Sequence, residues 1–439
     1  MSKQKNNIVV IGAGYVGLVS GTCFSEFGAN VIVADRDKDK IRKLQNGNIP
    51  IYEPGLQELV NKNMQSGNLT FKVNYSEYIN NSDALFIAVG TPSRRGDGHA
   101  DLKYVYEVAE EIATNIEKKI LIVNKSTVPV GSARKVGDII KKINSNTEFS
   151  VASNPEFLRE GSAIEDFMNP DRVIIGVDDE YSEAIMRDLY RPITEKNIPL
   201  MFTDPESAEL IKYASNAFLA TKISFINEIS SVCEKTGANV EEVSKGMGYD
   251  SRIGDQFLKA GPGYGGSCFP KDTLALVRIA EEHDLNIGVV KAAITANENQ
   301  KKRMVNKITD ALDGSIAEKR IGILGLTFKP ETDDMRDSPS ITIIKELIKE
   351  GAEIIAHDPH GLEEARNLLP DEVKLVESNS EAVIDADGLV LMTEWSEYLN
   401  IELEQFKSKM RGDAFIDLRN FLDKEKLESY GFRYFSVGK

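Results

Sequence analysis

A glycine-rich stretch around one cysteine is the part of this sequence best equipped for chemistry. It runs from Lys259 to Asp272 and reads Lys-Ala-Gly-Pro-Gly-Tyr-Gly-Gly-Ser-Cys-Phe-Pro-Lys-Asp. Its crowded glycines mark a loop whose backbone takes positive φ values or lies against a ligand. Cys268 follows them, with Lys271 close behind, and a thiol beside a cation can be held as a reactive thiolate. The alternative is an inert, buried cysteine after an ordinary turn, which the glycines and flanking charges disfavour.

A long apolar helix is predicted to carry a second group of reactive side chains. Asp204-Pro205 is a typical helix start, and the helix runs to about Lys235, or about 48 Å at 1.5 Å per residue. Lys212 and Asn216 lie on one face of it, and a mostly buried lysine is rare unless it is paired or functional. Apolar residues wrap more than one face, which predicts burial between domains or subunits. These residues are Leu210, Ile211, Phe218, Leu219, Ile223, Phe225, Ile226 and Ile229.

A dinucleotide-binding pattern opens the chain. The apolar run Ile8–Ile11 is typical of a buried parallel strand, and Gly12-Ala-Gly14-Tyr-Val-Gly17 follows it directly. A helix comes next, and then a second apolar run that ends in Asp35. This is the complete fingerprint of a dinucleotide-binding unit: a strand, a tight turn, a helix N-terminus that can bind the pyrophosphate, and an acid that can bind the ribose. Asp35 favours NAD, because it repels a 2′-phosphate, whereas Arg36 directly after it leaves NADP open.

Polar residues follow three further predicted strands. Thr91 and Thr127 come at carboxyl ends, where ligands bind in open α/β sheets, although such hydroxyls also cap turns. Glu156 and Glu160 are four residues apart, so we expect them to share one helical face, with a solvated face as the alternative. The strands are residues 84–89, 119–124 and 150–153.

The opening pattern returns near the C-terminus in altered form. The strand and glycine turn Arg320–Gly325 lead through a helix to a strand that ends in Asp358, but the third glycine is missing. The inserted segment is charged rather than glycine-rich, so we expect this second domain to bind something other than a dinucleotide. Lys329 in that segment and Arg419 after a later strand are candidate anion contacts, with plain surface charge as the alternative.

Composition limits the kind of protein and its partners. The chain has 439 residues, 41% hydrophobic content and a net charge of −16, typical of a protein with two or three globular domains that does not bind nucleic acid or anionic membrane. Three cysteines predict neither a disulfide framework nor a metal site, and no signal peptide or membrane span is expected. We expect a cytoplasmic enzyme with two doubly wound α/β, Rossmann-like domains joined by a long central helix and a helical linker. The expected regions are 1–203 for the cofactor, 204–313 for the central helices and the cysteine loop, and 314–439 for the substrate.

The motifs together resemble the UDP-glucose/GDP-mannose dehydrogenase family over essentially the whole chain. The segment Gly263–Asp272 is its most specific match and resembles the UDP-glucose 6-dehydrogenase branch, because relatives acting on GDP-mannose or N-acetylated UDP-sugars usually differ around the cysteine. The other matching segments are Gly12–Gly17, Lys125–Gly131, Asn154–Gly161 and Lys212–Asn216.

This resemblance implies a four-electron oxidation of a primary alcohol to a carboxylate, with two NAD and one water. Cys268 would form a thiohemiacetal with the aldehyde and then a thioester. Glu156 would activate water through Thr127. Lys212 and Asp272 would stabilise the oxyanion and handle the alcohol proton, and Asn216 would donate a hydrogen bond to the oxyanion. The implied cofactor residues are Gly12, Gly14, Tyr15, Val16, Gly17, Asp35, Lys40, Thr91, Thr127, Glu160 and Arg336. The implied substrate residues are Glu156, Phe157, Leu158, Lys212, Asn216, Arg252, Phe257, Lys259, Gly265, Phe328, Lys329 and Arg419.

The resemblance also implies a homodimer, in which Arg252 reaches into the other subunit. Other functions stay open on the residues alone. The same reaction on a UDP-N-acetylhexosamine or on GDP-mannose is one alternative. A two-electron hydroxyacid dehydrogenase would need no thiol, and a non-catalytic nucleotide-sugar sensor would need neither Glu156 nor Lys212.

Overall fold

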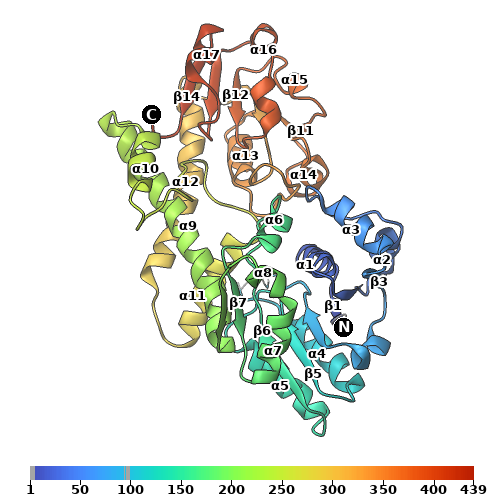
Figure 1. Cartoon of the computed structure of the whole chain (residues 1–439). Helices are drawn as coiled ribbons and strands as arrows, with labels where there is room; N and C mark the ends of the chain where they lie inside the picture. The colour runs from blue at the N-terminus through green and yellow to red at the C-terminus, as the bar shows by residue number, and fades with distance from the viewer. Residues whose placement is uncertain (1–4, 93, 95–98) are drawn as a thin grey trace. The chain divides into compact units, whose positions relative to one another are not determined.

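The chain forms two compact units, residues 1–215 and 216–439, in a computed structural model that describes residues 5–92, 94 and 99–439 (Figure 1). The boundary falls within one long helix, α9 (Pro205–Thr236), which confirms the predicted helix almost to the residue. Across the described part of the chain, no helix combines the length and the apolar character needed to cross a bilayer.

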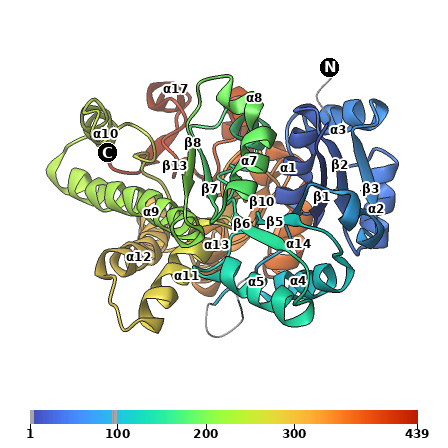
Figure 2. The ribbon, with the colours of Figure 1, turned by 60° about the horizontal axis from the view of Figure 1, so that its bottom comes forward.

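The first unit is built on an eight-stranded sheet with the order β3-β2-β1-β4-β5-β6-β7-β8. Neighbouring strands are parallel except β6 and β7. The first six strands have the order 3-2-1-4-5-6 of a Rossmann fold, and β1, β2 and β3 lie side by side in Figure 2. The strands are β1 (Asn7–Ile11), β2 (Asn30–Ala34), β3 (Leu69–Lys72), β4 (Ala84–Ile87), β5 (Ile120–Asn124), β6 (Phe149–Ser153), β7 (Val173–Gly176) and β8 (Leu200–Thr203).

Helices cover both faces of this sheet. Ile8 and Val10 of β1 belong to one apolar cluster, and Val9 and Ile11 to another, because successive side chains of a strand point to opposite faces. The first cluster includes side chains of α1, α3, α6, α7 and α8, and the second includes those of α4 and α5. The helices are α1 (Tyr15–Glu26), α2 (Lys38–Gln45), α3 (Leu56–Gln65), α4 (Lys103–Asn115), α5 (Ser132–Ile143), α6 (Ala163–Met168), α7 (Glu180–Leu189) and α8 (Arg191–Thr194).

The second unit repeats this topology. Its six-stranded sheet has the order β11-β10-β9-β12-β13-β14, and all neighbouring strands are parallel. Counted from β9, this is again the order 3-2-1-4-5-6, so the predicted second Rossmann-like domain is confirmed. The strands are β9 (Arg320–Leu324), β10 (Glu353–His357), β11 (Lys374–Leu375), β12 (Gly388–Leu391), β13 (Ala414–Asp417) and β14 (Arg433–Ser436).

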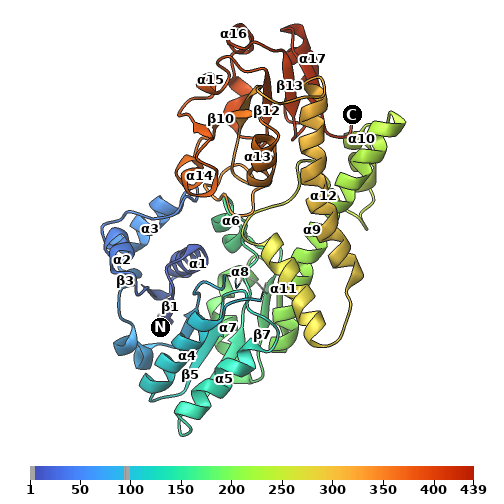
Figure 3. The same ribbon diagram turned by 180° about the vertical axis from the view of Figure 1, so that it is seen from behind.

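Helices α9 and α12 run side by side in the second unit, as Figures 1 and 3 both show. Ser224 of α9 donates to the carbonyl of Ala293 of α12 at 2.8 Å. The helices of this unit beyond α9 are α10 (Val240–Gly248), α11 (Phe269–Glu282), α12 (Gly288–Ala311), α13 (Pro339–Lys349), α14 (Leu362–Leu368), α15 (Asn379–Ala382), α16 (Leu403–Lys409) and α17 (Lys424–Ser429).

Two local expectations are wrong. Glu156 and Glu160 do not share a helical face, because residues 154–159 have no regular structure and Glu160 lies in a turn. The Glu156 carboxylate accepts from the backbone N–H of Leu158 at 2.6 Å, a local bond that competes with a helix. The apolar pattern after the cysteine loop also predicts a helix from Thr273 to His283, but α11 begins four residues earlier, at Phe269, since a proline such as Pro270 is well tolerated in the first turn. The division into three regions stays a prediction.

Candidate active site

The first glycine turn is shaped to admit a pyrophosphate. Gly12 has a φ of 110°, and a Cβ added there would lie 2.5 Å from the carbonyl oxygen of Ala88. Gly17 packs α1 against the same turn, since a Cβ there would collide with the Gly12 carbonyl. Gly14, by contrast, has no heavy atom of the described chain within 4 Å of an added Cβ. Among the described residues, no side chain caps α1 and no acid lies in its first turn, so its N–H groups are available to an anion.

Asp35 occupies the position of the ribose acid and is held in its charged form. It accepts from the backbone N–H of Ala13 at 2.9 Å and pairs with Lys40 at 3.0 Å. Burial alone would raise the pKa of Asp35, but bonds from the Asp37 and Ala13 backbones and from Lys40 together lower it. A carboxylate at this position suits the ribose hydroxyls of NAD and repels the 2′-phosphate of NADP.

Arg36 is engaged away from Asp35. Its guanidinium lies 4.4 Å from the ring centroid of Tyr104 and 3.3 Å from the Glu107 carboxylate, both on α4. This placement weakens the case for a phosphate contact, which the sequence had left open.

Tyr15 is held by a residue that the sequence pattern did not single out. Its hydroxyl donates to Glu53, whose carboxylate also accepts from the backbone N–H groups of Gly161 at 2.6 Å and Ala163 at 2.7 Å. Burial, then the bond to Glu53, raises the pKa of Tyr15, and the nearby Glu160 adds to this effect. Glu53 thus joins the start of α1 to the start of α6. The sequence Tyr-Glu-Pro around it gives no signal of that role.

A buried ion pair joins two of the expected catalytic residues in the first unit. Lys212 Nζ lies 3.2 Å from Glu156 Oε1, and the two side chains are only 4% and 6% exposed. Lys212 is therefore buried and paired, which is one of the two cases that the sequence left open for it, and its catalytic role stays a prediction. The ring centroid of Phe157, an expected substrate contact, is 5.3 Å from Lys212 Nζ. Close pairing keeps two opposite charges stable inside the protein and ready for proton transfer.

A second buried lysine lies behind this pair. Lys125 donates to Asn154 at 3.0 Å and to the hydroxyl of Tyr190 at 3.3 Å. Burial lowers the pKa of Lys125 to about 7, and the like charge of Lys212 adds to this, although Glu156 opposes it. Lys125 is therefore close to half-protonated at neutral pH.

The two threonines expected at the sheet edge are joined to each other. The Thr91 hydroxyl donates to the backbone carbonyl of Thr127 at 2.9 Å, so the turns after β4 and β5 are tied together. Thr127 is nearly buried and lines a small cavity with Lys212.

In the second unit, Cys268 lies directly before α11, where the helix dipole favours negative charge. Its Sγ is 3.5 Å from the Ser267 hydroxyl, and it is partly exposed, whereas Cys23 and Cys233 are buried. One turn into α11, the buried Asp272 accepts from Asn216 at 2.6 Å and pairs with Lys271 at 2.7 Å. Asn216 and Asp272, two of the expected catalytic residues, are thus in direct contact.

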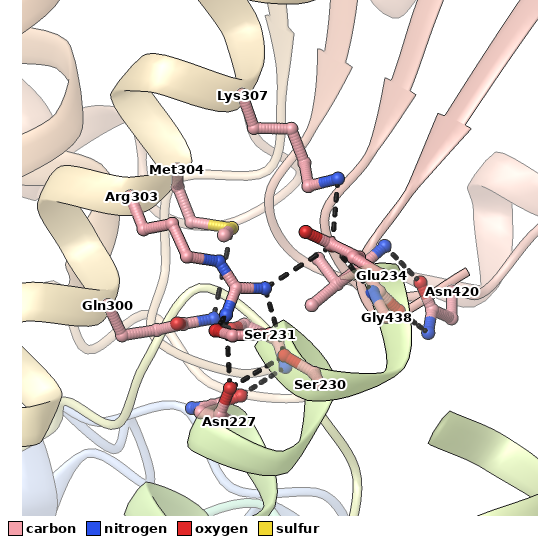
Figure 4. Close-up of polar contacts among 12 residues, drawn as sticks. Asn227, Ser230, Ser231, Glu234, Gln300, Arg303, Met304, Lys307, Asn420 and Gly438 are labelled. Atoms are coloured by element: carbon pink, nitrogen blue, oxygen red, sulfur yellow. Dashed lines mark hydrogen bonds and ion pairs between the residues drawn. The ribbon is translucent and has the colours of Figure 1, made fainter. Parts of the chain in front are cut away.

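Side-chain amides of α9 and α12 fix the cysteine loop. Asn227 accepts from the N–H of Gly261 at 2.9 Å, and Gln300 donates to its carbonyl at 2.7 Å. Asn297 makes the same two contacts with Tyr264, at 2.8 and 3.1 Å. In Figure 4, Asn227, Gln300 and Arg303 point toward one another in a network that Glu234 and Lys307 extend to Gly438. These amides were not predicted, because asparagine and glutamine at such positions resemble ordinary surface residues.

Expected substrate residues surround the same loop. A Cβ added at Gly266 would lie only 2.8 Å from the ring of Phe328, so the ring packs closely against the loop. Lys329 Nζ is 5.7 Å from the centroid of the same ring. Arg419 donates to the carbonyl of Phe328 at 2.8 Å and pairs with Glu394 at 3.1 Å. Its guanidinium is therefore held in place beside the loop.

The remaining expected contacts are more scattered. Phe257 has a φ of 63°, and its ring centroid is 6.0 Å from that of Phe269. Lys259 is exposed, and Arg336 pairs with Asp334 at 2.8 Å. Val16 and Leu158 are half-buried, and Gly265 lies against the backbone of Asp337. Arg252 pairs with Asp250 at 2.5 Å, and its side chain is 87% exposed. Its intersubunit role stays a prediction.

Asp358, the counterpart of Asp35 in the second sheet, is fully buried and saturated with donors. It accepts from the backbone N–H groups of Leu326 at 2.6 Å and Gly361 at 2.7 Å, and from Trp395 Nε1 at 3.2 Å. It has little capacity left for a ribose, which agrees with the prediction that this domain binds a different ligand.

These features define a class of protein. One Rossmann-like sheet carries an open glycine turn and a ribose acid, the other has lost them, and a cysteine and a buried Glu–Lys pair supply groups for covalent and acid–base chemistry. Such a set is that of a dinucleotide-dependent dehydrogenase with a reactive thiol.

Comparison with known proteins places the chain within that class. Residues 6–194, 206–299 and 322–424 match the NAD binding, central and UDP binding domains of the UDP-glucose/GDP-mannose dehydrogenase family. The chain is 51% identical to the UDP-glucose 6-dehydrogenase of Rhizobium meliloti, over 98% of this chain and 99% of that one. The UDP-glucose dehydrogenase structure from Pyrobaculum islandicum superposes with a TM-score of 0.91 at 37% identity, covering 100% of this chain and 98% of that one. The chain belongs to this family and is an NAD-dependent oxidoreductase.

A more distant structure shows the same fold. The UDP-D-ManNAc dehydrogenase of Pyrococcus horikoshii superposes with a TM-score of 0.87 at 26% identity, covering 98% of this chain and 99% of that one.

Proposed function

We propose that the chain is a UDP-glucose 6-dehydrogenase, which oxidises the C6 alcohol of UDP-glucose to the carboxylate of UDP-glucuronate. The observation that carries this proposal is identity of 46–51% with relatives of that name over 98% or more of the chain. Structures named for N-acetylated sugars are only 25–26% identical, against 37% for the one named for UDP-glucose. This difference favours UDP-glucose over the other nucleotide sugars.

NAD, when bound, accepts the hydride in each of the two oxidation steps. The residues of the first glycine turn fit it, since Gly14 faces open space and the N–H groups of α1 are available to the pyrophosphate. Asp35 would accept from the ribose hydroxyls, and Lys40 would hold its charge. The further contacts we propose for the cofactor are Tyr15, Val16, Thr91, Thr127, Glu160 and Arg336.

In the first half-reaction, the Asp272 carboxylate takes up the proton of the C6 hydroxyl and the Lys212 ammonium stabilises the oxygen that loses it, as the alcohol becomes an aldehyde. The Cys268 thiolate then adds to the aldehyde carbon, and the oxyanion of the thiohemiacetal is stabilised by Lys212 and Asn216. Loss of a second hydride gives a thioester. Water that Glu156 deprotonates, with Thr127 beside it, hydrolyses the thioester and releases the thiol. Each turnover consumes two NAD and one water and releases three protons.

We propose the following contacts for the uridine diphosphate and the sugar. Arg419 and Lys329 supply cationic groups for the diphosphate, and Phe328 supplies an aromatic face. Gly265 is a further proposed sugar contact, and its lack of a side chain lets the loop backbone pack against Asp337. The further substrate contacts that we propose are Glu156, Phe157, Leu158, Lys212, Asn216, Arg252, Phe257 and Lys259.

We also propose a homodimer. One face of α9 exposes a row of large apolar side chains at intervals of seven or eight residues, and such a row on a soluble helix marks an interface. Arg252, with its side chain in solvent, is free to contact a second copy. The row consists of Leu210, Phe218, Phe225 and Val232, which are 43–66% exposed.

Three cysteines without a disulfide agree with a cytoplasmic location, which we propose together with the three-region division at residues 203 and 313. The proposed function is tested by incubating the purified chain with NAD and a panel of UDP- and GDP-sugars. UDP-glucose should give the highest kcat/KM, two NADH per sugar and UDP-glucuronate by mass spectrometry. A higher kcat/KM for a UDP-N-acetylhexosamine or for GDP-mannose would contradict the proposal.

A further inference from the structure

Glu209, which no motif singled out, is a buried acid at the centre of the first unit. It lies on α9 one turn before Lys212 and is 3% exposed. Its carboxylate accepts three hydrogen bonds, from the N–H groups of Gly131 at 2.6 Å and Ala133 at 2.9 Å and from the Ser153 hydroxyl at 2.8 Å. Burying a carboxylate costs free energy, and three donors that offset this cost indicate that Glu209 has a specific role in the fold or the site.

The donors come from segments that carry the other candidate catalytic residues. Gly131 and Ala133 begin α5, directly after the turn that contains Thr127, and Ser153 ends β6, three residues before Glu156. Glu209 itself shares α9 with Lys212. One carboxylate therefore joins the three segments that hold Thr127, Glu156 and Lys212, and these segments cannot move apart without breaking its bonds.

A small cavity that both side chains line connects Glu209 to Lys212. It is lined by Asn124, Ser126, Thr127, Ser153, Glu209 and Lys212 among others, and has about 10 Å³ of room for the centre of a water molecule. That volume suits one buried water. Both polar atoms of the Asn124 amide are buried and have no hydrogen-bond partner among the described residues. Buried amides are nearly always satisfied, so Asn124 points to an ordered water in this cavity.

We propose that Glu209 is a positioning residue for Lys212, acting through one water molecule that Asn124 binds in the cavity both residues line. The proposal rests on the proposed function, in which the Lys212 ammonium stabilises the reacting oxygen. The water is bound rather than consumed, and it gives the Lys212 ammonium a polar contact in addition to Glu156.

The charges around Glu209 make this contact sensitive to pH. Burial raises the pKa of Glu209 to about 7, against the bonds from Ser153, Ala133 and Gly131. Glu206 on the preceding turn adds to this effect, although it is itself paired with Arg134. The other charged groups of this region are Lys212 and Glu156, with Lys125 behind them. Glu209 is thus charged above about pH 7 and supports the Lys212 ammonium most strongly there.

The test compares Glu209→Gln with Glu206→Gln, the same change one turn away on an exposed acid. With UDP-glucose and NAD, Glu209→Gln should lower kcat by about tenfold to a hundredfold, with little change in KM for NAD. This range is taken from metal enzymes, in which a residue that hydrogen-bonds to a metal ligand positions that ligand in a comparable way. The wild-type fall in kcat below pH 7 should flatten in Glu209→Gln, whereas Glu206→Gln should keep this fall, moved to slightly lower pH because the Glu206 charge helps to raise the pKa of Glu209. A Glu209→Gln enzyme that matches Glu206→Gln at every pH would overturn the proposal.

Asn124→Leu tests the water separately, because leucine has a similar size and leaves no polar group to bind it. It should lower kcat as Glu209→Gln does, and the double variant should be no slower than the slower single one, since both changes remove one connection. Additive losses would contradict a shared water. Should Glu209→Gln fail to fold, Asn124→Leu and a high-resolution crystal structure of the wild-type chain decide the question. A cavity without water density in that structure overturns the inference, whereas a wild type inactive on every sugar overturns only the proposed function.

Discussion

The sharpest consequence of the buried charges concerns Lys125 and the stability of the first unit. In the folded chain its pKa is about 7, against an ordinary value of 10.5. Between these two values the unfolded state binds one more proton than the folded state, so the free energy of unfolding rises with pH. Each pH unit is worth up to about 1.36 kcal/mol, and because half of the folded molecules still hold the proton at pH 7, the gain from pH 7 to pH 9 is roughly 2 kcal/mol.

Lys125→Met removes this dependence, because methionine does not titrate. Asn154 keeps one donor in the variant, since the Tyr190 hydroxyl still donates to it at 2.6 Å. We expect the wild type to gain about 4–8 °C in Tm relative to Lys125→Met between pH 7 and pH 9, taking about 2–4 °C per kcal/mol for a unit of this size. Below pH 6 both states of the wild type hold the proton, so the two curves should run parallel.

Differential scanning calorimetry at pH 5 to 9 provides the assay. The relevant transition is the one that NAD shifts upward, because ligand binding stabilises the unit that contains the cofactor site. Lys135→Met on the exposed side of α5 is the matched control and should follow the wild type, since that side chain is in water in both states. A constant difference in Tm between wild type and Lys125→Met across this range would refute the reasoning and show that Lys125 stays charged when buried.

Three further predictions test the remaining assignments. Cys268→Ser should keep the fold and bind both ligands but lose steady-state turnover by orders of magnitude, because a serine ester hydrolyses more slowly than a thioester; near wild-type turnover with two NADH per sugar would exclude the covalent route. The kcat/KM for NAD should exceed that for NADP, and Asp35→Asn should narrow the ratio; an equal or higher wild-type value for NADP would show that Arg36 outweighs Asp35. Phe218→Glu places a charge in the exposed apolar row of α9 and should convert a dimer into monomers in light scattering, whereas a fully active wild-type monomer at micromolar concentration would remove both the interface and the role of Arg252.

The sequence determined the features that depend on neighbours along the chain. The first glycine turn and Asp35 could be predicted because a β-α-β unit places a turn, a helix N-terminus and a strand end in fixed relation within some thirty residues. Helix α9 was predicted within one residue at each end, since its N-cap, its proline and its apolar period all lie in one segment. The second Rossmann-like sheet was predicted from the same local signals.

Only the tertiary structure decided which side chains complete the site. Glu53 meets Gly161, and Glu209 meets Gly131, from positions 108 and 78 residues away in the chain. The sequence gives no signal of such a contact, because a glutamate that is buried in this way has the same kind of neighbours along the chain as a glutamate on the protein surface. Asn297, which holds Tyr264 of the cysteine loop, is another such case.

The contrast between Asp35 and Asp358 shows the physical reason. Both end the second strand of a Rossmann-like sheet, and the sequence presents them as copies of one motif. The Asp35 carboxylate is partly exposed and pairs with Lys40. The oxygens of Asp358 instead accept hydrogen bonds from backbone N–H groups of the surrounding turns and from the indole of Trp395. A carboxylate has few acceptor positions, and the fold decides which donors reach them. Local sequence therefore specifies where an acid stands, and the packing of distant segments specifies whether it binds a ligand or the protein itself.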